Sequence, residues 1–143
     1  MRPRLLLSLM LAFTAGGTAG GAAAEDLATK MIMALDVNPA AVAFWAAGND
    51  PPENESAVAA DARWAAALRG AETMQAKGRL LQSQGLAREG AWSSFAELMI
   101  SLSREGEVAV KAKDAEKAFE IGGRLYDACN GCHKTYVPRT PPP

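Results

Sequence analysis

The residues best suited to do chemistry stand close to the C-terminus, where Cys129, Cys132 and His133 form a Cys-x-x-Cys-His sequence. Two thiols at this spacing, followed directly by an imidazole, are typical of the site where a c-type haem is attached. The thiols add to the two vinyl groups of the porphyrin as thioethers, and the imidazole binds the iron as an axial ligand. If the segment is helical, the three side chains lie on nearly one face of the helix. The sequence therefore predicts covalent haem c, with its iron, near the end of the chain.

Other uses of a Cys-x-x-Cys pair find little support in the rest of the sequence. A redox dithiol is expected in a βαβ context, but no alternation typical of strands persists along the chain. A zinc site needs two further ligands of the Cys or His type, whereas the chain has two cysteines and one histidine in total. An exported dithiol protein without haem is kept as an alternative.

The N-terminus has the pattern of a secretory signal peptide. Arg2 and Arg4 precede an apolar run over residues 5–13, and small residues follow up to Ala24. This pattern predicts a leader over residues 1–24 that is cleaved after Ala24. The apolar run is too short to span a bilayer, although an uncleaved anchor is the competing interpretation. No later segment is expected to be apolar enough for a transmembrane helix, so we expect a soluble periplasmic protein.

The remainder, residues 25–143, has a length typical of one domain. The whole chain carries 15 basic and 16 acidic residues. It has no basic stripe with interleaved aromatic residues, so a nucleic-acid partner is not expected. The sequence suggests no Ser/His/Asp or Cys/His arrangement apart from the haem motif, so we expect an electron carrier rather than an enzyme. Its expected partners are redox proteins of the periplasm.

Composition and periodicity predict helices throughout this domain, because it is rich in Ala, Leu, Glu, Lys and Arg. Apolar residues at steps of three and four define four segments. These segments cover residues 26–49, residues 54–84, a third stretch from Gly90 that weakens between residues 106 and 113, and residues 114–136. The predicted fold is all-α, an antiparallel four-helix bundle over residues 25–136 with the haem attached to the last helix. A flexible Pro-rich tail follows over residues 137–143.

Local signals refine these helices. We expect Asn38-Pro39 to interrupt the first helix, because proline lacks a backbone donor and disfavours helical geometry at the residue before it. Asp114 is the expected N-cap of the last helix. Gly122, on the inward face of that helix, leaves room for either a flat, bulky group or a close helix–helix contact.

The order of these features resembles the class II c-type cytochromes, the cytochrome c′ group and its low-spin relatives. In that family the haem motif lies at the C-terminal end of a four-helix pattern, behind a signal peptide. Residues 123–136 resemble the terminal signature of the family, and Trp92 resembles the tryptophan near the start of its third helix. Many members have a basic residue where Val137 stands here. The resemblance implies thioether bonds at Cys129 and Cys132 and a proximal ligand at His133. Related bundles often pair through their first two helices, so a homodimer stays open.

The second axial position of the iron separates two functions. The chain has no second histidine, which excludes ligation by two histidines. In low-spin relatives a methionine of the first helix fills this position, and we favour Met31 over Met33 because Met31 shares a stripe with Leu27 and Leu35. Methionine ligation favours single-electron transfer, although both residues could equally be core methionines. Without a methionine, the iron is five-coordinate and open to small gases such as NO or CO. Aromatic candidates to pack near the haem are Trp45, Trp92, Tyr126 and Tyr136.

Overall fold

The computed structural model describes residues 19–137, and every regular element in that range is helical. The elements are α1 (Ala19–Ile32), the π-helical turn η1 (Met33–Val37), α2 (Asn38–Gly48), α3 (Ala57–Leu81), α4 (Trp92–Lys111) and α5 (Ala115–Tyr136). The all-α prediction is confirmed for this part of the chain. Most of the predicted leader, and the predicted tail beyond residue 137, lie outside the described residues.

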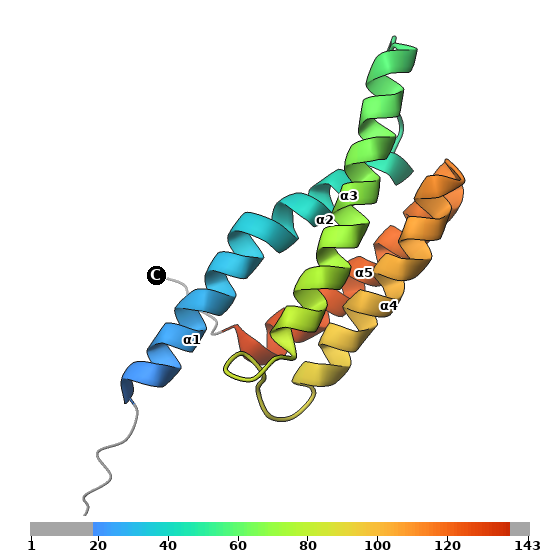
Figure 1. The fold of residues 1–143 in the computed structure, drawn as a ribbon. Coiled ribbons are helices and arrows are strands. Elements are labelled where there is room, and N and C mark those ends of the chain that lie inside the picture. The colour runs from blue at the N-terminus through green and yellow to red at the C-terminus, as the bar shows by residue number, and fades with distance from the viewer. Residues whose placement is uncertain (1–18, 138–143) are drawn as a thin grey trace, which may run out of the picture.

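Four helices, α2, α3, α4 and α5, pack against one another (Figure 1). α3 contacts α2 and α4, while α5 contacts α4 and α2. The four helices therefore close around one core, and each contributes a side chain that solvent hardly reaches: Phe44, Met74, Leu102 and Leu125. Burying a side chain of this size stabilises a fold by about 1.5–3 kcal/mol.

Capping residues set where the later helices begin. Ser56 is the N-cap of α3, and its hydroxyl accepts a hydrogen bond from the Ala59 N–H at 3.2 Å. Asp114 caps α5, since its carboxylate accepts a hydrogen bond from the Lys117 N–H at 2.9 Å. The cap predicted at Asp114 is thus confirmed. α3 ends at Leu81, a little earlier than predicted, and the α3–α4 loop (residues 82–91) follows.

The first helix differs from the prediction at Asn38-Pro39, where no break occurs. Asn38 keeps helical backbone angles (φ −62°, ψ −51°), and its N–H bonds to the carbonyl of Met33, five residues earlier. In a regular α-helix the proline ring would clash with the carbonyl four residues before it. The wider π turn of η1 relieves this clash, so the chain continues as one bent helix from α1 into α2 (Figure 1).

The inward face of α1 and η1 also differs from the prediction. Leu27, Met31 and Leu35, expected to face the core, are 60%, 51% and 67% exposed. Thr29 and Val37 are buried instead. The π turn contains more residues than a regular α-helical turn, so the inward face runs through Thr29 and Val37 rather than through Leu27, Met31 and Leu35.

α2 and α5 approach each other closely where glycines leave room. The Trp45 indole lies against Gly122, and its Nε1–H donates a hydrogen bond to the Gly122 carbonyl at 3.0 Å. A Cβ atom on Gly122 would lie 2.9 Å from Cδ1 of Trp45. Gly48 brings α2 equally close to the α5 backbone at Phe119. The space predicted at Gly122 is therefore used for a contact between helices.

One helix among the described residues, Asp26–Gly48, is long and apolar enough to cross a membrane by length and composition. The expectation that no segment beyond residue 24 would reach this level is therefore wrong by this criterion. Core helices of soluble proteins and signal sequences near an N-terminus pass the same test. The apolar N-terminal helix is compatible with a signal sequence, which fits export, and equally with a membrane span.

We predict that Gly122→Ala destabilises the protein by about 1–3 kcal/mol, because the added methyl group overlaps the Trp45 indole and forces α2 from α5. Gly123→Ala is the matched control, since a Cβ there meets nothing within 4 Å. The control is expected to be neutral or to stabilise the helix by about 0.5–1 kcal/mol. Urea denaturation followed by circular dichroism measures both, and equal stabilities of the two variants would contradict the proposed close contact.

Candidate functional site

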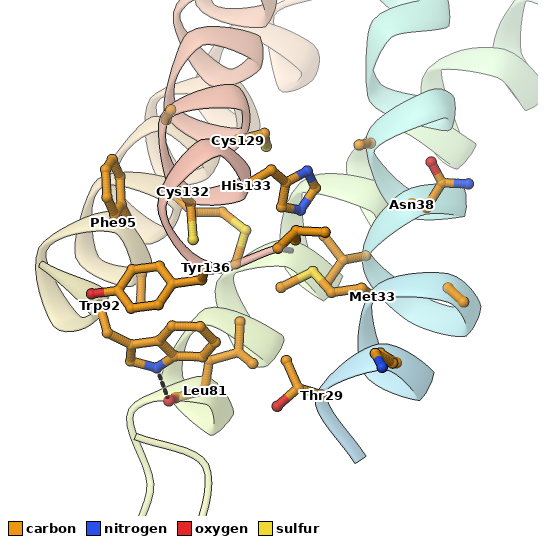
Figure 2. A pocket seen from close by; sticks show the side chains of 18 of the residues that line it. Thr29, Met33, Asn38, Leu81, Trp92, Phe95, Cys129, Cys132, His133 and Tyr136 are labelled. Carbon is orange, nitrogen blue, oxygen red and sulfur yellow. Dashed lines mark hydrogen bonds between the residues drawn. The ribbon is translucent and has the colours of Figure 1, made fainter. Parts of the chain in front are cut away.

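The predicted haem-attachment motif lies on the last two turns of α5. Leu125 and Ala128 place one face of this helix in the core, and Cys129, Cys132 and His133 follow it toward the C-terminal end. All three motif residues line one cavity of about 540 Å³ (Figure 2). The helix therefore brings both thiols and the imidazole to a single wall.

The opposite wall is one continuous face of the first helix. Its lining residues recur at steps of three and four through α1, η1 and α2: Asp26, Thr29, Lys30, Met33, Ala34, Val37, Asn38, Ala41 and Trp45. The end of α3 and the first turns of α4 complete the cavity with Leu81, Trp92, Phe95, Ala96 and Met99. Most of these side chains are apolar, and the volume falls within the range of roughly 300–1,000 Å³ that is typical of small-molecule sites.

Both cysteines are free thiols and are half-buried. Burial raises the pKa of Cys129 above its usual value, and the neighbouring Cys132 raises it further. Burial also raises the pKa of the Cys132 thiol, against a smaller opposing effect of the Arg88 charge. The reactive thiol of a redox dithiol has a lowered pKa instead, so this environment weighs against the dithiol interpretation.

His133 and Met33 reach into the cavity from opposite sides. His133, the only histidine of the chain, extends from α5, while Met33 extends from η1 (Figure 2). An imidazole and a thioether together are the axial ligand pair typical of c-type cytochromes. The cavity thus presents a nitrogen ligand on one wall and a sulfur ligand on the other.

Met31, favoured from the sequence as the sixth ligand, does not line the cavity. Its side chain is exposed, whereas that of Met33 is half-buried and lines the cavity. Two residues along an α-helix correspond to a rotation of about 200°, so both methionines cannot face the same wall. The structure therefore places Met33 at the cavity, and not Met31.

Three of the aromatic residues expected near the haem line the cavity: Trp45, Trp92 and Tyr136. Tyr126 does not. Its side chain is exposed, and its ring centroid lies 6.4 Å from that of Trp45. Phe95, which the sequence analysis did not single out, packs against Gly131 within the motif, where a Cβ would lie 2.9 Å from its ring.

Trp92 is the centre of contacts that hold the α3–α4 loop against the end of α5. Its Nε1–H donates a hydrogen bond to the Leu81 carbonyl at 2.7 Å, and its ring meets Tyr136 edge-on with centroids 5.1 Å apart. The Tyr136 hydroxyl donates a hydrogen bond to the Glu89 carbonyl at 2.7 Å. The guanidinium of Arg88 lies 4.8 Å from the centroid of the Trp92 ring. These contacts place Arg88 at the cavity, a position that no sequence pattern had indicated.

Within residues 19–137, no group of three or more His, Cys, Asp or Glu side chains is arranged to hold a metal ion directly. Comparison with known proteins gave no match to a family model, to a curated protein or to a solved structure.

We predict that the thiols of the haem-free chain react slowly with iodoacetamide at neutral pH. Because the pKa values of Cys129 and Cys132 are raised, their thiolate fractions are smaller than those of ordinary cysteines, and the alkylation rate keeps rising above the usual thiol range. Mass spectrometry of the alkylated chain across pH measures this, with the urea-unfolded chain as control. Faster alkylation of the folded chain at neutral pH would contradict the prediction and favour a redox dithiol.

Proposed function

We propose that this chain is an exported monohaem c-type cytochrome, with haem attached through Cys129 and Cys132 and its iron bound by His133. The observation that carries the proposal is the convergence of these three side chains on one mostly apolar cavity. A Cys-x-x-Cys-His sequence by itself is only a pattern, but here it also faces a space of small-molecule size. We further propose that the four helices form an antiparallel bundle, as in the class II c-type cytochromes that the sequence resembles.

The cavity residues suit a covalently attached haem. The thiols of Cys129 and Cys132 are free, so each sulfur can bond to one carbon of a vinyl group while the thiol proton passes to the other carbon. The mostly apolar walls suit the faces of a porphyrin. His133 and Met33 offer the nitrogen and sulfur that an iron between them would bind.

When bound, haem supplies one-electron chemistry through the ferric and ferrous states of its iron. The contribution of this chain is to hold the group, to supply axial ligands and to limit contact with water. If it bound the iron together with His133, a Met33 thioether would raise the reduction potential relative to a second imidazole. We therefore propose single-electron transfer to and from redox proteins of the periplasm, without enzymatic chemistry of its own.

Export is part of this proposal. α1 begins at Ala19, inside the predicted leader. Cleavage after Ala24 removes the first residues of α1 but leaves every residue that lines the cavity, since that lining begins at Asp26. Retention of the leader as an anchor leaves the same lining in place. The proposed haem site is thus compatible with either outcome.

Binding of small gases is the second candidate function. The wall that carries Met33 also includes Val37 and Ala41, which are buried beside the cavity. An iron that Met33 does not bind would have an open position for NO or CO. Whether Met33 binds the iron therefore decides between electron transfer and gas binding.

The protein exported from a bacterium with c-type haem maturation is predicted to carry haem that acid and organic solvent do not extract. Cys129→Ser with Cys132→Ser is expected to abolish this covalent attachment, because no thiol remains to add to a vinyl group. Absorption spectra and the intact mass of the chain measure the outcome. A colourless wild-type protein, with thiols free or joined to each other, would contradict the proposed function.

Met33→Ala is expected to convert a low-spin spectrum that is indifferent to CO into a high-spin spectrum that shifts on CO binding, because the sulfur ligand is lost. The reduction potential of this variant is also expected to fall. Met31→Ala is the matched control, two residues away on the exposed side, and is expected to leave the spectrum unchanged. A high-spin, CO-sensitive wild-type spectrum would instead support the gas-binding function.

A further inference from the structure

Three charged residues lie together on the lining of the otherwise mostly apolar cavity. Asp26 and Lys30 come from α1, and Arg88 comes from the α3–α4 loop. The Asp26 carboxylate joins the two cations, at 2.8 Å from Nζ of Lys30 and 3.1 Å from Nη2 of Arg88. We call these three residues the charged rim.

Arg88 is the less exposed of the two cations. Its side chain is 30% exposed, against 70% for Lys30. The guanidinium is held over the Trp92 ring, and Trp92 is itself fixed by its hydrogen bond to the Leu81 carbonyl. An arginine in such a stacked position is pre-organised for a planar anion, whereas a flexible lysine is not.

Within the described part of the chain, the Arg88 guanidinium donates one side-chain hydrogen bond, from Nη2 to Asp26. A guanidinium has five N–H donors in a fork that matches a carboxylate. Arg88 can therefore keep Asp26 and still bind a second carboxylate through its other nitrogens. The charged rim also carries an excess positive charge, because it has two cations and the single anion of Asp26.

Haem brings two propionate carboxylates into its site, and carboxylates near an apolar cavity need charged or hydrogen-bonded partners. We propose that Arg88 binds a haem propionate at the charged rim, with Asp26 and Trp92 orienting its guanidinium. This proposal rests on the proposed function. Arg88 is then a cofactor-binding residue supplied by a loop, and Asp26 and Trp92 are positioning residues.

This placement has an electrostatic consequence for the iron. A cation close to the haem stabilises the ferrous state, which carries one positive charge fewer than the ferric state. Loss of the Arg88 charge is therefore expected to lower the reduction potential. A residue that only braces the α3–α4 loop would change stability without this shift.

The test uses the exported haem protein in three forms: wild type, Arg88→Gln and Arg124→Gln. Arg124 is the matched control because it forms an ion pair with Glu105 at 2.7 Å and does not line the cavity. We expect Arg88→Gln to lower the midpoint potential, to shift the propionate bending band in resonance Raman spectra, and to reduce the thermal stabilisation that haem confers. Arg124→Gln is expected to leave all three unchanged.

Arg88→Lys refines the test, since it keeps the positive charge but loses the guanidinium that lies over the Trp92 ring. Its potential is expected to stay closer to wild type than that of Arg88→Gln, with part of the thermal stabilisation lost. Equal potentials and Raman bands in Arg88→Gln and Arg124→Gln would overturn the assignment of Arg88, even if Arg88→Gln is less stable. A wild-type protein without haem would instead overturn the proposed function itself, so the two failures are distinguishable.

Discussion

The contact between the Trp45 indole and Gly122 is the constraint on which the rest of the site depends. It fixes α2 to α5 by a hydrogen bond at 3.0 Å and by a fit that a single methyl group would disturb. From this point the first helix continues toward Asp26 and α5 continues toward His133, with the cavity between them. α1 has no extensive packing against α3, α4 or α5 among the described residues. Its place as a cavity wall therefore depends on its continuity with η1 and α2.

The other side of the cavity is organised around Trp92, which links three parts of the chain. It joins the end of α3 through the Leu81 carbonyl, the last turn of α5 through Tyr136, and the α3–α4 loop through Arg88. A buried indole combines a large apolar surface with one polar group that needs a partner, so it can fix both a helix and a loop. The wall next to the cysteines is thus held by side-chain contacts between elements far apart in sequence.

Several features were predictable from sequence because they depend on local chemistry. The all-α class, the cap at Asp114 and the shared face of Cys129, Cys132 and His133 follow from propensity, capping and helical spacing. The inward face of the first helix was not predictable in this way, because the side that carries Leu27, Met31 and Leu35 is apolar but exposed. The choice of face depends on tertiary packing and on η1, whose π turn has no simple sequence signal beyond Pro39. The role of Trp92 in placing Arg88 likewise depends on contacts across the α3–α4 loop.

The π turn at η1 also bears on how this chain compares with others. A π turn is equivalent to a one-residue insertion in a regular helix. A related protein with one residue fewer in this turn would have an unbroken α-helix, and the residues on both sides of the turn would keep their faces. Aligned without a gap, such a protein would pair Met33 with a position on a different side of its helix. Matching ligand positions across this helix therefore requires counting turns from Trp45, where α2 is anchored, rather than from the N-terminus.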